Sequence, residues 1–105
     1  MITVKVDAGI CGFHTTMKAS SEDMMTVQTS IESECEDVRA MAADVAELDA
    51  MAQAFGKVGE TPLYKTGAKY LRHAACPVPC ALTKAVEAAA GLALPKDVSI
   101  NITKD

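Results

Sequence analysis

Four cysteines are the residues of this chain whose type and spacing allow chemistry. They are Cys11, Cys35, Cys76 and Cys80, and His73 lies shortly before the third of them. Cysteine thiolates and histidine nitrogens are usual protein ligands of zinc and of iron–sulfur clusters. The spacing contains no Cys-x2-Cys pair and no ferredoxin-like run, so a shared site has to be assembled by the fold.

Three of the cysteines fall where one expected element gives way to the next. Cys11 precedes Gly12 in a turn, Cys35 begins a long helical pattern, and Cys76 lies at the start of a late helix. The partial positive charge at a helix N-terminus stabilises a thiolate, which is the form that binds metal. We therefore predict that Cys11, Cys35 and Cys76 are metal ligands.

The fourth ligand is open between Cys80 and His73. Cys80 follows Cys76 by one turn if this stretch is helical, and His73 precedes Cys76 by three residues. The alternative for Cys80 is packing beneath the helix, and the alternative for His73 is a capping or solvated role. Because free cysteine is a common small core residue, four purely structural cysteines are the competing interpretation of the whole set.

Alternation of apolar and polar residues predicts strands near 2–7, 13–19, 25–32 and 98–102. The inner faces of these strands are formed by Ile2, Val4 and Val6; Phe13, Thr15, Met17 and Ala19; Met25, Val27 and Ile31; and Val98, Ile100 and Ile102. A glycine turn separates the first two strands, and the polar residues 20–23 form the next connection.

Apolar residues at steps of three and four predict three helices. Ser33 and Glu36 match a capping box, and the helix after it should run about five turns, to Phe55 and Gly56. Thr61 and Pro62 are typical of a second helix start, and a third helix should begin near 77–79 and end at Gly91. The expected fold is α+β, a sheet of about four strands with two to three helices on one face.

The global composition limits the function. A chain of 105 residues is one domain, residues 1–105, and half of it is apolar with no Trp, so the core should consist of Ala, Val, Ile, Leu and Met. A net charge of −4 without a basic cluster argues against nucleic acid as a partner. No apolar run reaches the ~20 residues of a membrane helix, and the N-terminus resembles a strand, not a signal peptide. We therefore expect a cytoplasmic protein with reduced thiols.

The order of elements and cysteines resembles the iron–sulfur scaffold proteins of the IscU/NifU N-terminal type. That family has a Cys-Gly-Asp near its first strands, a cysteine opening the helix after the hairpin, and a His-Cys pair opening a late helix. Cys11-Gly12 matches the first, Cys35 the second and Cys76 the third, over roughly residues 10 to 90. The resemblance implies an IscU-like sheet and the same three cysteines as cluster or metal ligands.

Several departures separate this chain from that family. Phe13 stands in place of the Asp that is associated with a labile cluster, and Ala75 in place of the His. The family's Leu-Pro-Pro-Val-Lys chaperone signal is absent, and a strand is added after the last helix. The strings ICGF, ESEC, HAACPVP and GLALPKDVSI are also similar to a small uncharacterised prokaryotic family.

The predicted function is a non-catalytic protein that binds an iron–sulfur cluster or zinc, as a scaffold or carrier that exchanges its cargo with a donor or acceptor protein. Shared ligands at ~2.3 Å from a metal would bring the three sulfurs within about 4 Å of one another. One alternative is a thiol redox protein with Cys76 as nucleophile and Cys80 as resolving partner. The other is a small interaction domain whose cysteines only pack.

Overall fold

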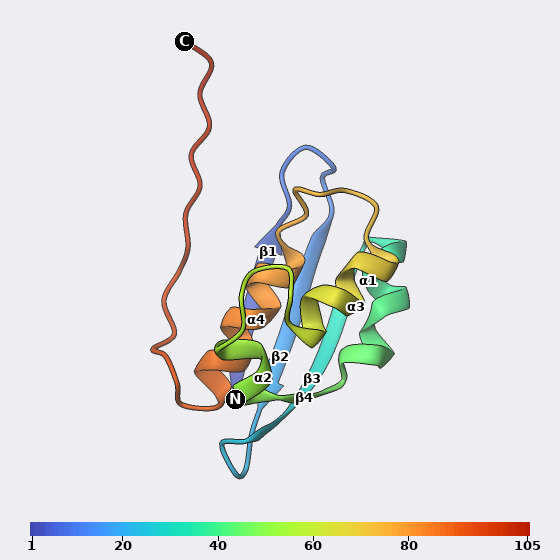
Figure 1. The fold of residues 1–105 in the computed structure, drawn as a ribbon. Helices are drawn as coiled ribbons and strands as arrows, with labels where there is room; N and C mark the ends of the chain where they lie inside the picture. The colour runs from blue at the N-terminus through green and yellow to red at the C-terminus, as the bar shows by residue number, and fades with distance from the viewer.

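The computed structural model describes residues 1–105 as an antiparallel sheet with helices packed on one face (Figure 1). The strand order is β1-β2-β3-β4, so each strand pairs with the one before it in the chain. The strands are β1 (Ile2–Asp7), β2 (His14–Ser20), β3 (Thr26–Ser33) and β4 (Glu47–Asp49). This arrangement confirms the α+β class and the four-stranded sheet.

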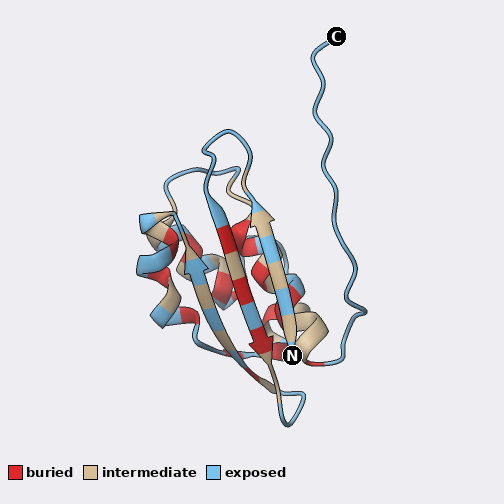
Figure 2. Ribbon diagram, turned by 180° about the vertical axis from the view of Figure 1, so that it is seen from behind, coloured by how far each residue is buried: buried red, intermediate tan, exposed pale blue.

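Burial along the strands follows the pleat. Thr15, Met17 and Ala19 of β2 are buried beneath the helices, and the residues between them face solvent or lie half-exposed. The view from behind shows this alternation on the uncovered face of the sheet (Figure 2). Two residues expected on the inner face are instead exposed, Phe13 and Met25, because both precede the paired part of their strands.

The helices are α1 (Glu36–Met41), α2 (Ala50–Ala54), α3 (Pro62–Tyr70) and α4 (Val78–Ala89), with a 3-10 turn η1 (Ala42–Val45) after α1. Helices α3 and α4 match the second and third predicted helices. The N-cap of α3 is Thr61, whose hydroxyl accepts a hydrogen bond from the Tyr64 amide, and Pro62 occupies the first turn as predicted. None of the helices has the length and apolar content needed to cross a bilayer.

The predicted five-turn helix is wrong, because the chain leaves the helix to pair with the sheet. Strand β4 aligns Leu48 with Val27 of β3, and Leu48 is buried there. The amide and hydroxyl of Thr29 also donate to the carbonyls of Ala46 and Val45, at 2.8 and 2.6 Å. The open edge of β3 thus gains backbone partners that a continuous helix would leave unmade.

The predicted capping box is also wrong. Ser33 is the last residue of β3, where its hydroxyl lies 2.7 Å from the Thr15 hydroxyl and accepts from the Cys35 amide at 3.0 Å. The N-cap of α1 is Cys35, and no side chain caps this helix. The helix therefore begins two residues later than the sequence pattern suggested.

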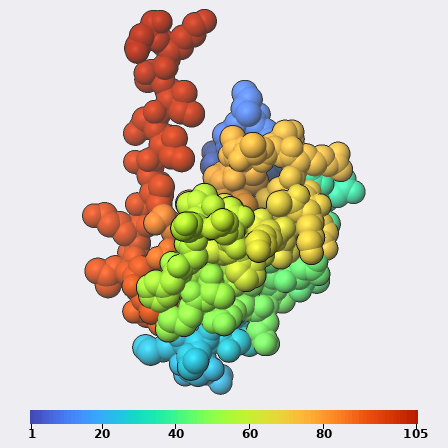
Figure 3. All heavy atoms as spheres, in the orientation of Figure 1, coloured from blue at the N-terminus to red at the C-terminus, as the bar shows by residue number.

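The predicted final strand does not form within the chain. Residues 92–105 contain no helix or strand and leave the end of α4 as an extended segment (Figure 3). Val98, Ile100 and Ile102 are 56, 76 and 89 % exposed. The alternation is present in the sequence, but no strand of this chain pairs with it.

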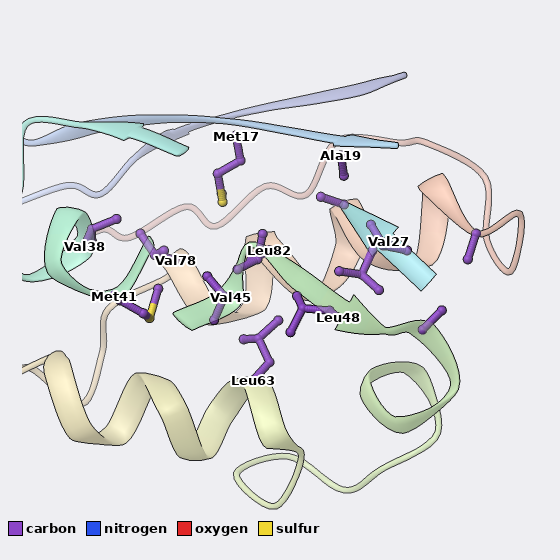
Figure 4. Close-up of a cluster of buried hydrophobic side chains, with 14 residues drawn as sticks. Met17, Ala19, Val27, Val38, Met41, Val45, Leu48, Leu63, Val78 and Leu82 are labelled. Atoms are coloured by element: carbon purple, nitrogen blue, oxygen red, sulfur yellow. The ribbon is translucent and has the colours of Figure 1, made fainter. Parts of the chain in front are cut away.

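The core lies between the sheet and the helices and contains only aliphatic and methionine side chains, as predicted (Figure 4). Met17 points from the sheet toward the helices, and Leu82 of α4 is fully buried below it. Full burial of such side chains contributes about 1.5–3 kcal/mol each. The core residues are Met17, Ala19, Val27, Val38, Met41, Val45, Leu48, Ala50, Leu63, Val78, Leu82, Ala85, Val86 and Ala90.

Candidate functional site

Three cysteine-bearing segments lie at the same end of the sheet. These are the turn between β1 and β2, the junction between β3 and α1, and the 71–77 connection between α3 and α4 (Figure 1). The antiparallel order explains this, since β1 ends, β2 begins and β3 ends at one edge of the molecule. Cys11, Cys35 and Cys76 come from these segments, one from each.

Cys11 lies in an exposed turn shaped by two glycines. Gly9 and Gly12 have φ of +88° and +75°, and the Gly12 amide donates to the Gly9 carbonyl at 2.9 Å. Such positive φ values favour glycine over residues with a Cβ. No heavy atom beyond the adjacent residues lies within 4 Å of the Cβ position at either glycine, so nothing packs against this part of the turn.

Cys35 is half-buried at the start of α1. It is the N-cap residue, with extended backbone at φ −85° and ψ 123°, and its side chain packs against the edge of the core. The hydrogen bond from its amide to Ser33 fixes the backbone at this point.

Cys76 is the electrostatic centre of the group. Its side chain is half-buried, and burial raises the pKa of its thiol. The negative charges of Cys35, Cys11 and Asp37 raise that pKa further, while a hydrogen bond from the Val78 amide at the start of α4 acts in the opposite direction. Coulomb interactions fade with distance in water. The structure therefore brings Cys11, Cys35 and Cys76 into one electrostatic neighbourhood.

The three thiols do not form a ready-made ligand set. No three His, Cys, Asp or Glu side chains lie close enough together to hold a metal ion. The expected contact of the three sulfurs is therefore wrong for this conformation. The physical reason is that Cys35 and Cys76 rest against the core, whereas Cys11 stands out in the solvent-exposed turn.

The two candidates for a fourth position lie in different surroundings. Cys80 is exposed in the first turn of α4, near the Tyr64 side chain. Burial and the neighbouring Cys80 raise the pKa of Tyr64. His73 is exposed in the 71–77 connection, and its carbonyl accepts from the Cys76 amide at 3.2 Å.

Asp37 is a site residue that the sequence pattern did not single out. Its side chain is only 21 % exposed. Its carboxylate pairs with Arg72 at 3.2 Å and thereby ties the first turn of α1 to the 71–77 connection. Its position two residues after Cys35 was the only signal available in the sequence.

A histidine and two carboxylates anchor the turn that carries Cys11. One oxygen of Glu34 accepts from the His14 amide at 2.7 Å and lies 3.0 Å from the His14 ring. The other ring nitrogen lies 3.6 Å from Asp7 at the end of β1. His14 is exposed, as predicted, and this cluster fixes both ends of the turn to the sheet.

Comparisons with known proteins give a family but no activity. No curated protein and no solved structure matches the chain. One family model matches residues 2–102, nearly the whole length, and its description is "Family of unknown function (DUF6951)". The chain with this three-cysteine end therefore belongs to the DUF6951 family of unknown function.

Proposed function

We propose that this is a non-catalytic protein that binds zinc or an iron–sulfur cluster through Cys11, Cys35 and Cys76, as a scaffold or carrier. The observation that carries the proposal is geometric: Cys11, Cys35 and Cys76 come from three separate segments that lie at the same end of the sheet (Figure 1). Thiolates are the ligands that zinc and iron–sulfur clusters prefer.

A bound cation would resolve the electrostatic conflict at this end. Ionised Cys76 is disfavoured by burial and by the negative charges around it, and positive charge at the same place reverses the sign of that interaction. Cys35 and Cys76 also lie at the N-terminal ends of α1 and α4, where the backbone amides favour a thiolate.

The donor chemistry fits zinc or an iron–sulfur cluster, whereas the present separation of the thiols does not. Binding therefore requires the turn of residues 8–13 to close over Cys35 and Cys76. The open surroundings of Gly9 and Gly12 support such a movement, because nothing packs against these two residues.

For the fourth position we propose His73. It belongs to the same connection as Cys76, and a backbone hydrogen bond joins the two residues. Cys80 lies near Tyr64 and is not among the groups that raise the pKa of Cys76. Neutral imidazole is a good zinc ligand and adds no further negative charge.

The proposal retains the resemblance to the IscU/NifU N-terminal type as its functional model. The order of strand, Cys-Gly turn, hairpin strands, cysteine-opened helix and late cysteine-opened helix supports it. A cargo carrier needs a donor or acceptor protein, and the exposed Cys11 turn offers a route for exchange. All four thiols are free, which suits a reducing compartment such as the cytoplasm.

Two observations support this proposal over the thiol redox alternative. Nucleophilic cysteines have lowered pKa values, whereas the pKa of Cys76 is raised. The groups that act on Cys76 are Cys35 and Cys11, while the supposed resolving thiol, Cys80, lies near Tyr64.

The test is an anaerobic purification followed by metal and sulfide analysis and a zinc titration. We expect about one metal or cluster per chain, and Ala replacement of Cys11, Cys35 or Cys76 should weaken zinc binding by more than about 100-fold, because loss of a direct ligand exceeds the 10–100-fold loss seen for supporting residues. Cobalt substitution would report the ligand number through its visible spectrum.

Cys80→Ala is the matched control, since it removes a thiol from the next helical turn and should change the affinity by less than about threefold. His73→Ala should weaken binding more than Cys80→Ala does. Absence of stoichiometric binding, or an equal loss in Cys80→Ala and Cys35→Ala, would contradict the proposal.

A further inference from the structure

The first strand of the sheet has an unpaired edge. Strand β1 pairs only with β2, so the backbone groups along its other side have no partner within the sheet. An exposed edge of this kind is a template for another strand. Ile2–Asp7 contains no Pro, so every residue of the strand keeps its backbone amide, and its only charged side chains are Lys5 and Asp7.

A groove of about 840 Å³ runs along this edge, between β1, the flank of α4 and residues 93–98. Its apolar lining comes from the inner face of β1, which is only half-buried, and from small residues beside it. These lining residues are Ile2, Val4, Val6, Pro77, Ala81 and Ala88. The groove is thus shaped for a strand that brings apolar side chains at alternate positions.

The C-terminal segment of the same chain is such a strand without a partner. Val98, Ile100 and Ile102 alternate with Ser99, Asn101 and Thr103, a pattern with high β-propensity. All three apolar residues are more than half exposed. Such a run is unusual on a free surface, and it marks a contact site.

The groove of the same chain does not receive this segment. The residues beside the groove are Ala93–Val98, which include Pro95, a residue without an amide to donate. Ile100 and Ile102 lie beyond the groove, and the chain continues past the end of the sheet, away from the body of the molecule (Figures 1 and 3). The segment therefore extends to where another molecule can take it.

We propose that residues 98–102 of one copy pair with the β1 edge of a second copy and seat their apolar side chains in its groove. The addition of a strand to a sheet edge is a recurrent mode of association. Reciprocal exchange by two copies closes the contact as a two-fold dimer and leaves neither β1 edge open. The occupant is a second copy because this chain supplies both the empty edge and the unpaired strand.

The test is the mass of the full chain by sedimentation equilibrium, with reductant and chelator present so that neither disulfides nor metal bridges link the copies. We expect a dimer, twice the chain mass of 11.0 kDa. The double variant Ile100→Lys with Ile102→Lys should raise the dimer dissociation constant on the order of 100-fold or more, because it places charges in the apolar groove. These side chains are exposed in the single chain, so the change leaves its fold intact.

The control carries the same two charges on the opposite face of the segment, Ser99→Lys with Asn101→Lys, and should remain dimeric. A complementation experiment tests the groove and the C-terminal segment separately, because Ala81→Arg blocks the groove and leaves the C-terminal segment intact. Mixing it with the Ile100→Lys, Ile102→Lys variant should give a heterodimer held by one exchanged strand, although each variant alone is monomeric. A monomeric wild-type chain at high concentration, or a dimer that persists in the Ile100→Lys, Ile102→Lys variant, would overturn the proposal.

Discussion

At the residue scale, the pKa of the Cys76 thiol determines how metal binding at the candidate site depends on pH. Its thiol is disfavoured as an anion by burial and then by the charges of Cys35 and Cys11. Because a raised pKa leaves the thiol protonated, metal binding has to displace a proton. For each proton displaced, the logarithm of the apparent affinity rises by about one per pH unit below that pKa.

A change at Cys35 tests the coupling without any metal. Cys35→Ser keeps the size of the side chain and removes its ionisable thiol, so the pKa of Cys76 should fall. The pH dependence of Cys76 alkylation, followed by peptide mass spectrometry, measures this shift. Cys80→Ser is the control and should leave the profile of Cys76 in place. An unchanged alkylation profile in Cys35→Ser would contradict the claim that Cys35 raises the pKa of Cys76.

Glu34 provides a pH-dependent contribution to the fold. The backbone hydrogen bond from His14 and then the His14 side chain hold the pKa of this carboxyl below its ordinary value. A depressed folded-state pKa stabilises the fold above the unfolded-state value, and this contribution is lost as the pH falls through the folded-state value. Acid should therefore loosen the anchor of the Cys11 turn.

Glu34→Gln should lower the free energy of unfolding at neutral pH, and the difference from wild type should disappear in acid, where Glu34 is protonated. Urea denaturation between pH 7 and pH 3 measures this. Glu32→Gln removes an exposed acid two residues earlier, on β3, and is the reference. A loss of stability in Glu34→Gln that is equal at every pH would indicate a role without ionisation.

At the element scale, Gly67 and Gly56 differ in whether the surrounding structure leaves room for a Cβ. A Cβ at Gly67, within α3, would lie 3.4 Å from the Pro79 Cγ, which is an ordinary contact. A Cβ at Gly56 would lie 2.5 Å from the Thr61 Cγ2 and would push against the cap of α3. Gly67 therefore lowers the stability of α3 although a Cβ would fit at its position. Gly56 has to be glycine because Thr61 lies too close for a Cβ.

Gly67→Ala should raise the free energy of unfolding by about 0.5–1 kcal/mol through helix propensity. Gly56→Ala should lower it by about 1–3 kcal/mol through overpacking against Thr61. Chemical denaturation of the two variants under one condition is the measurement. Effects of the same sign in both variants would contradict this account of how α3 and α4 pack.

The elements that the sequence predicted are those governed by local signals. Strands near the N-terminus followed from alternation, and α3 followed from Thr61 and Pro62. The long helix failed because apolar residues at helical spacing also suit a short strand between helical turns, and the open edge of β3 decides between them. A backbone edge on a distant strand leaves no mark in the local pattern.

The candidate site was predictable in part for the same reason. The three cysteines were placed at one end by element order, and the structure brings them into one electrostatic neighbourhood. Their lack of direct contact and the involvement of Asp37 depend on loop conformation and on the ion pair with Arg72. Both are tertiary features, which spacing along the chain does not encode.

At the scale of the whole molecule, the predicted C-terminal strand is wrong for the single chain, because residues 92–105 form no strand. A chain considered alone has to pair its strands internally, and here one edge and one segment both lack a partner. If two copies exchange these segments, the expected strand forms between molecules.

The consecutive strand order has a consequence for synthesis. Each strand pairs with its predecessor, so the meander from β1 to β4 can form once residues 2–49 have left the ribosome. The apolar face of β1 and β2 stays uncovered until α4, which supplies Leu82, Ala85 and Val86, is translated. At about 5–20 residues per second, this apolar surface is exposed to other molecules for seconds during translation.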